Sequence, residues 1–350
     1  MYKKFFMGIA AMAALTLVSC SSDDLNSLSD NSSKNEAISF DGYLGRSAVS
    51  VNGSRGSELN LNALKGENGG FGVFGNYSSE GTTTAYGDNW FKNQKVTYKT
   101  SAWTYDDVKY WLPQGHIDFL AYAPHVGGTT LKNTSCIDFT VESEAAKQKD
   151  LLWANAANQT KENISSTNNK VKFQFAHALS RLGYTVKTNV VGTGTTITLN
   201  KITLAGSEDG TSKAAFYTSG TIDLSKANNA SDLWTNQSGK QNFPWFTGSQ
   251  SLTSTSTYNN PETDYLFVIP QNFSTGTDKL YVIVDYTINY NTGVQSTMKT
   301  NVCKQLKQEF KQGKAYTINL TIGLTPIEFD ADVTPWDPTN GTPIDINSWN

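Results

Sequence analysis

Few side chains in this sequence have the type and spacing that catalysis or metal binding requires. The three histidines, His116, His125 and His177, include no pair at metal-ligand spacing, and neither Cys136 nor Cys303 lies near one of them. A G-x-S-x-G elbow, a phosphate-binding loop and a Rossmann glycine pattern are also missing from the sequence. The sequence therefore predicts a protein that is not an enzyme and that holds no metal or cofactor.

Acidic residues offer a weaker alternative. Asp106-Asp107 and Glu208-Asp209 lie in turn-like sequence, where carboxylates are usually solvated and only sometimes bind calcium weakly. Asp330 and Asp332 share the outer face of a predicted strand. Glycosidases need opposed carboxylates at a defined separation, which this sequence does not indicate.

Tryptophan offers a second alternative. A row of exposed indoles would stack on sugars, and the protein would then be a surface glycan-binding lipoprotein of a nutrient-uptake system. Tryptophan and tyrosine are also common in sandwich cores and protein interfaces, so both interpretations stay open. The tryptophans considered are Trp90, Trp103, Trp111, Trp234, Trp245 and Trp336.

The strongest chemical signal is Cys20. Lys3 and Lys4 precede an apolar run over residues 5–18, which ends in Leu17-Val18-Ser19-Cys20. A leucine three positions before a cysteine, with a small residue directly before that cysteine, is the lipobox pattern. The run is shorter than the roughly 20 apolar residues that span a bilayer. We therefore predict lipid attachment at Cys20.

The segments on either side of Cys20 fit export to the cell surface. Residues 1–19 are predicted to be a lipoprotein signal peptide, and residues 20–36, rich in Ser, Asn and Asp, a flexible tether. Ser21-Ser22-Asp23-Asp24 resembles a surface-export signal of some Gram-negative lipoproteins, or is merely a solvated part of the tether. We expect an outer membrane lipoprotein at the cell surface, held by its acyl chains.

Charge and cysteine content narrow the list of partners. The net charge is -3, from 28 basic and 31 acidic residues, and no Lys/Arg-rich block occurs. Nucleic acid is therefore not expected as a partner. Cys136 and Cys303 either form one disulfide in an oxidising compartment or remain two buried thiols.

The elements that must position any site are strands. Apolar residues alternate with polar ones along several short segments, and a switch of this alternation at Asn200-Lys201 predicts a bulge. About 310 residues follow the tether, and a chain of this length usually folds around more than one hydrophobic core. The polar run 158–169 (NQTKENISSTNN) separates two strand-rich halves. We predict an all-β protein with β-sandwich domains at 37–160 and 170–350. The alternating segments are 171–175, 197–204, 280–288 and 316–322.

Several short segments follow one another along the chain in a recognisable order. They are AISF at 37–40 followed by RSA at 46–48, GFGVFG at 70–75, WLP at 111–113, DFLAYAP at 118–124, DLL at 150–152, FAHALSRL at 175–182, GKAY at 313–316 and PW at 335–336. In this order and spacing the chain resembles the fimbrillin family, the type V pilins of Gram-negative anaerobes. The resemblance extends over residues 37–336.

The resemblance implies two tandem transthyretin-like sandwiches and a structural or adhesive role in fimbriae. It also implies that a trypsin-like protease cuts after an arginine near the N-terminus, at Arg46 or alternatively at Arg55. Loss of the first strand would open a groove for a strand of another fimbrial subunit. Host or bacterial surface ligands are further implied partners. His177, in the family's F-x-H motif, is interpreted as a core or hydrogen-bonded residue.

The first strand itself can be described from the residues. Ile38 and Phe40 share one face of a short strand, with Ala37 and Ser39 on the other. Gly42 and the next glycine, at position 45, are expected to bracket a flexible turn before the first candidate arginine. The segment is therefore predicted to be a removable plug; the alternative is that residues 37–40 form a permanent edge strand and that Arg46 is merely a solvated charge.

Overall fold

The computed structural model describes residues 36–44, 59, 61–67, 69–191, 194–228, 230–261, 264–290, 293–324 and 333–334. Strands make up almost all of their regular structure, which confirms the all-β prediction. The elements are β1 (Phe40–Leu44), α1 (Leu61–Lys65), β2 (Phe71–Ser78), β3 (Phe91–Lys99), β4 (Ala102–Thr104), β5 (His116–Ala123), β6 (Cys136–Thr140), η2 (Ala145–Lys147), β7 (Leu152–Gln159), η3 (Ser165–Thr167), β8 (Val171–His177), β9 (Ser180–Thr188), β10 (Thr195–Ala205), β11 (Phe216–Asp223), β12 (Trp234–Gln241), β13 (Phe243–Leu252), β14 (Tyr258–Asn259), β15 (Leu266–Val268), β16 (Gln271–Asn272), β17 (Tyr281–Tyr290), β18 (Thr297–Gln305), β19 (Glu309–Phe310), β20 (Ala315–Ile322) and β21 (Val333–Thr334).

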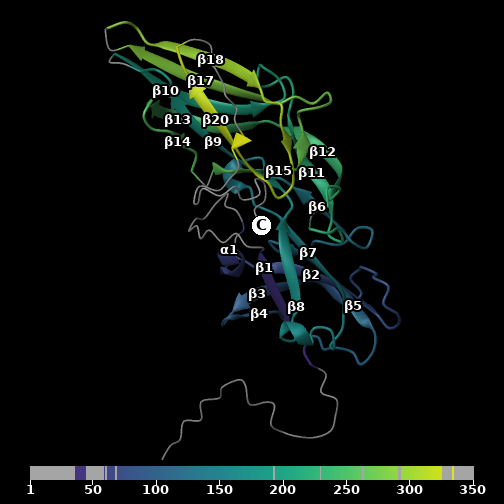
Figure 1. Cartoon of the computed structure of the whole chain (residues 1–350). Coiled ribbons are helices and arrows are strands. Elements are labelled where there is room, and N and C mark those ends of the chain that lie inside the picture. The colour runs from purple at the N-terminus through teal and green to yellow at the C-terminus, as the bar shows by residue number, and fades with distance from the viewer. Residues whose placement is uncertain are drawn as a thin grey trace, which may run out of the picture. The chain divides into compact units, whose positions relative to one another are not determined.

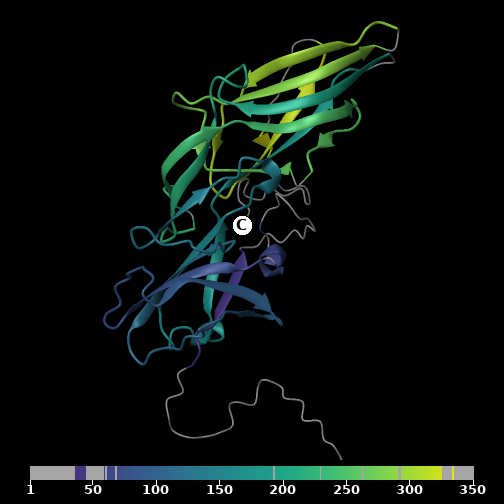
Figure 2. The same cartoon turned by 180° about the vertical axis from the view of Figure 1, so that it is seen from behind.

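One sheet contains the first strands of the chain. Its order is β1-β8-β7-β5-β2-β3-β4, and β1 pairs with β8 in parallel whereas the other neighbours are antiparallel. The two strands lie side by side in Figures 1 and 2, although more than a hundred residues separate them in sequence. Every residue of β5 is buried, as expected for a central strand covered on both faces.

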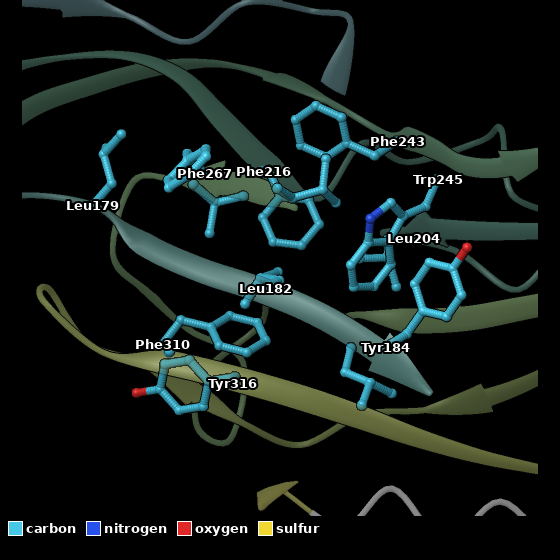
Figure 3. Close-up of a cluster of buried hydrophobic side chains, with 14 of the residues drawn as sticks. Leu179, Leu182, Tyr184, Leu204, Phe216, Phe243, Trp245, Phe267, Phe310 and Tyr316 are labelled. Carbon is cyan, nitrogen blue, oxygen red and sulfur yellow. The ribbon is translucent and has the colours of Figure 1, made fainter. Parts of the chain in front are cut away.

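The later strands form further sheets, with the orders β13-β10-β17-β18, β14-β9-β20-β21, β12-β11-β6 and β16-β19. Their apolar faces share one core (Figure 3), in which Leu182 and Tyr184 of β9 lie among aromatic rings from other strands. The ring centroids of Tyr184 and Trp245 are 4.8 Å apart, and those of Phe310 and Tyr316 are 5.0 Å apart.

Two local sequence predictions can be compared with this fold. The alternating segments all form strands, and the predicted bulge is present as a register shift between Leu199 and Lys201 of β10. The polar run 158–169 connects β7 to β8, which pair with each other. Strand pairing also joins β6, before this run, to β11 after it. The division into domains at 37–160 and 170–350 stays a prediction, as does the transthyretin-like form of each.

Candidate functional site at the first strand

The predicted removable plug contains β1, which lies at one end of its sheet. Residues Phe40 to Leu44 stand opposite Val171 to Phe175 of β8, in parallel register. Just before the strand begins, the backbone N–H of Val171 donates to the carbonyl of Ser39 at 2.8 Å. One side of the plug is thereby held by a regular ladder of backbone hydrogen bonds.

The segment after β4 holds the other side of the plug. The N–H of Ile38 donates to the carbonyl of Lys109 at 2.8 Å, and the N–H of Trp111 donates to the carbonyl of Glu36 at 2.9 Å. The Tyr105 hydroxyl donates to the carbonyl of Ile38 at 2.7 Å. Burial raises the pKa of Tyr105, so this phenol remains a hydrogen-bond donor at neutral pH. The plug therefore fills a slot between two chain segments.

The inward side chains of the plug complete an aromatic core. Ile38 is 1% exposed and Phe40 is 2% exposed, as predicted for two residues on one face. The Phe40 ring centroid lies 5.4–5.7 Å from four other rings, in edge-on, tilted and stacked arrangements; these belong to Tyr105, Phe91, Phe119 and Phe173. Full burial of an aliphatic or phenylalanine side chain contributes about 1.5–3 kcal/mol.

Gly42 is not in a turn, and the expectation that it begins one is wrong. It lies in the middle of β1, opposite Phe173, and is buried. A Cβ atom on this residue would lie 3.2 Å from Cε2 of Phe175 and 3.3 Å from Cε1 of Phe71. These distances are shorter than ordinary carbon–carbon contacts, so the two rings occupy the space that a side chain would need.

The slot is built for a backbone interaction and not for covalent chemistry. Its walls carry N–H and C=O groups that β1 satisfies, and its floor is apolar. Withdrawal of the plug would leave those groups unpaired beside exposed aromatic rings, and each unpaired buried group costs about 1–3 kcal/mol. Cys20, Arg46 and Arg55, the predicted lipidation and processing residues, lie outside the described residues.

His177 is a buried, hydrogen-bonded residue, as predicted. Its Nδ1 lies 2.5 Å from Oδ2 of Asp150, and both side chains are almost fully buried. The same carboxylate accepts the N–H of Leu151 at 2.8 Å and the N–H of Leu59 at 3.3 Å. This network ties the start of β7 to the end of β8 and to the chain that precedes α1. Its position indicates a structural role.

The other candidate residues lie apart from the slot or within cores. His116 Nε2 lies 3.2 Å from Oδ2 of Asp118, and His125 is half-buried in a loop. Among the residues that the structure describes, no cluster of three His, Cys, Asp or Glu side chains could hold a metal ion. Cys136 and Cys303 are free thiols and do not form a disulfide, but both are half-buried and not buried as the second option expected.

The tryptophans do not form an exposed row within the described ranges. Trp103, Trp111 and Trp245 are buried, and Trp234 and Trp90 are half-buried and packed against the cores. The Trp234 and Trp245 indole N–H groups donate to backbone carbonyls at 2.8 Å, which accounts for their orientation. Trp336 lies outside the described residues.

Sequence reasoning missed Tyr105 and the segment 109–111 as walls of the slot. Tyr105 is 67 residues from its partner Ile38, and no local pattern indicates that they meet. The alternation of Ile38 and Phe40 did identify the inward face of the plug.

The fold and the slot define an all-β protein in which β1 pairs with β8 and the residues just before it, 36–38, hydrogen-bond to the segment 109–111. The chain belongs to the fimbrillin-like family, whose model matches residues 62–336. No curated protein sequence matches it significantly. Within the described residues, no helix has the length and apolarity needed to cross a membrane.

Solved structures similar to this chain include proteins from Bacteroides species. A fimbrial protein from Bacteroides vulgatus ATCC 8482 is 22% identical, with a TM-score of 0.62 over 83% of this chain and 96% of its own. This similarity concerns the fold. Two proteins assigned to cell adhesion are more distant. The one from Bacteroides ovatus ATCC 8483 is 15% identical with a TM-score of 0.47 over 87% of this chain and 99% of its own. The one from Bacteroides uniformis ATCC 8492 is 17% identical with a TM-score of 0.44 over 86% and 98%.

Proposed function

We propose that this protein is a structural or adhesive subunit of surface fimbriae. It is exported as a lipoprotein attached through Cys20 to the outer membrane. It is assembled when a protease removes its first strand and a strand from another subunit takes the vacated place. Membership of the fimbrillin-like family supports the fimbrial role. The observation that carries the assembly step is the slot around residues 36–44, with backbone partners on both sides and an aromatic floor.

The slot makes strand replacement favourable once β1 has gone. The parallel ladder with β8 and the hydrogen bonds to Lys109 and Trp111 need an extended chain, because a folded loop cannot match their spacing. The pockets of Ile38 and Phe40 need apolar side chains at alternate positions. A strand from a second subunit meets both needs, and its entry removes the cost of the exposed slot.

Proteolysis is the step that makes the exchange directional. While β1 is joined to the rest of the chain, it is always present at the slot and outcompetes a strand that has to arrive from solution. A cut after Arg46 or Arg55 would end that advantage. The cleaved strand would then be held by a short interface, and a longer or better-fitting strand would displace it.

Limited trypsin treatment of the purified protein tests this proposal. Wild type, Arg46→Ala, Arg55→Ala and the double variant are digested in parallel, and N-terminal sequencing identifies the cut. We expect one early cut, loss of the 36–44 peptide on incubation with a second strand, and formation of higher oligomers. The double variant should remain intact and monomeric. A cleaved protein that stays monomeric and binds neither its own 36–44 peptide nor any other strand would overturn the proposal.

A further inference from the structure

A cavity of about 560 Å³ lies beside the connection between β8 and β9. Its walls come from the end of β8, from residues 228–237 with the start of β12, from β16, and from β19 with the connection to β20. The described residues that line it include none of the slot residues. Small-ligand sites in proteins usually measure about 300–1,000 Å³, so this cavity has the size of a binding site.

One wall of the cavity contains Trp234, whose ring is fixed in place. Its indole N–H donates to the carbonyl of Ala178 at 2.8 Å, and its ring covers Gly220, where a Cβ atom would lie 3.0 Å from Cε3. Phe139 packs edge-on against the same ring, with the two centroids 6.0 Å apart. An aromatic surface that is already fixed loses little freedom when a ligand packs on it, so it is suited to binding.

Three half-buried amide side chains also line the cavity and share one arrangement. Each donates through its NH₂ group to a backbone carbonyl, which fixes the plane of the amide. No described residue donates to their side-chain carbonyl oxygens, and each NH₂ group keeps a second hydrogen. Each amide therefore offers an acceptor beside a donor, which is the pair that one hydroxyl group needs. The three are Asn228, bonded to Gln174; Gln237, bonded to Pro270; and Gln312, bonded to Ala230.

The chain that carries Gln312 is held on both sides of this residue. Before it, the carbonyl of Lys311 accepts the hydroxyl of Ser180 at 2.8 Å. After it, the N–H of Gly313 donates to the carbonyl of Leu179 at 2.9 Å. Both partners lie at the start of β9, so the wall is ordered before any ligand arrives.

The charges around the cavity indicate a neutral ligand. Nζ of Lys311 lies 3.2 Å from Oε2 of Glu309, so these two charges at the rim offset each other. The described lining holds no arginine and one further lysine, Lys314, whereas proteins recognise phosphate and carboxylate groups with arginine forks or several cations. The ligand that matches a fixed aromatic ring and several amides has both hydroxyl groups and C–H faces.

We propose that this cavity binds a short neutral saccharide. The ring of Trp234 is the surface on which a face of aliphatic C–H groups packs, because the face of an aromatic ring is negative and such hydrogens are slightly positive. The three amides bind the hydroxyl groups. The inference rests on the proposed adhesive role and names the class of ligand for it. Saccharides of animal glycans and of bacterial polysaccharides share this chemistry.

Titration of the purified full-length protein with defined saccharides tests the inference. The probes are short neutral oligosaccharides of glucose, galactose, mannose, fucose and N-acetylhexosamines, taken from both sources, with sialylated and sulfated versions as the charged arm. Calorimetry measures the Kd, and saturation-transfer NMR identifies the protons that touch the protein. We expect at least one neutral saccharide to bind through a C–H face. Absence of binding by every neutral saccharide, or binding of the charged versions alone, would overturn the inference.

Variants of the amides place the binding in this cavity. Gln237→Ala and Gln312→Ala should each weaken binding about fivefold, since one hydrogen bond is worth about 1 kcal/mol. Gln241→Ala is the matched control, because Gln241 is on the same strand as Gln237, also donates to a backbone carbonyl and does not line the cavity. Equal weakening by the control, or no weakening by the two cavity variants, would overturn the site.

Variants of the tryptophan test the stacking surface. Trp234→Ala should weaken binding roughly tenfold, and Trp234→Phe should weaken it less, because an aromatic face remains. Trp90→Phe, in a residue that does not line the cavity, is the control and should leave the Kd unchanged. Circular dichroism and urea unfolding show whether each variant is folded. If Trp234→Ala does not fold, the amide variants decide the outcome by themselves.

The two proposals fail separately in these experiments. Strand exchange in the trypsin experiment without saccharide binding would overturn this inference and leave assembly by strand replacement standing. Saccharide binding without strand exchange would support the cavity as an adhesive site and overturn the assembly step.

Discussion

Truncating Phe40 should loosen the first strand while the rest of its sheet stays folded. The ring is 2% exposed and lies among Phe91, Phe119, Phe173 and Tyr105, which cannot collapse into the vacated space without breaking their own contacts. Phenylalanine-to-alanine changes in such cores cost about 3–5 kcal/mol. Because β1 lies at the end of its sheet, we expect the lost stability to increase the equilibrium constant for local opening of the plug more than the one for global unfolding.

Hydrogen exchange of the Ile38 amide measures that opening directly. This amide donates to the Lys109 carbonyl at 2.8 Å, so it exchanges only when the plug leaves the slot. A cost of 3 kcal/mol corresponds to roughly a 100-fold increase in its exchange rate, at about tenfold per 1.4 kcal/mol. Tyr43→Ala is the matched control, because Tyr43 is on the same strand, faces outward and is 40% exposed.

The control should change stability by less than about 0.5 kcal/mol, as usual for surface substitutions. The reasoning is refuted if Phe40→Ala and Tyr43→Ala accelerate exchange equally. It is also refuted if Phe40→Ala accelerates exchange to the same degree throughout the central strands β5 and β2, since β1 would then be an inseparable part of the sheet.

Three further changes have defined outcomes. Cys20→Ala should leave the protein soluble in the periplasm or stalled as precursor, and a variant that still partitions with outer membrane after high-salt washing would contradict lipid attachment there. Tyr105→Phe should lower the free energy of unfolding by about 1 kcal/mol, since it removes the hydrogen bond to the Ile38 carbonyl. Burial raises the pKa of Tyr105, so the phenol ionises more readily in the unfolded chain than in the folded one. The free energy of unfolding of the wild type, measured in urea, should therefore fall as pH rises above about 10. An equal loss of stability at alkaline pH in Tyr105→Phe would exclude this phenol as a contributor. Asp150→Ala should lower the free energy of unfolding by about 3–5 kcal/mol, because it removes a buried carboxylate shared by His177 and two backbone amides. A decrease below about 1 kcal/mol in urea unfolding would contradict that role.

The inward face of the plug could be predicted from the sequence, but the surroundings of the plug could not. Alternation placed Ile38 and Phe40 on one face because successive side chains of a strand point in opposite directions. Gly42 was expected in a turn because glycine is common there. A glycine occupies this position because Phe71 of β2 and Phe175 of β8 lie too close to leave room for a side chain. Tertiary contact therefore overrode the local preference of the residue.

The sequence by itself determined the class of structure, the lipobox prediction and the facing of individual strands. These depend on composition and on a period of two, which are local properties of the chain. Only the tertiary structure decided that β1 pairs in parallel with β8 and that the segment 109–111 closes the other side of the slot. Backbone hydrogen bonds are alike at every residue. The choice of partner strand is therefore made by which arrangement buries the most apolar surface with the fewest unpaired groups, and that sum is taken over the whole chain.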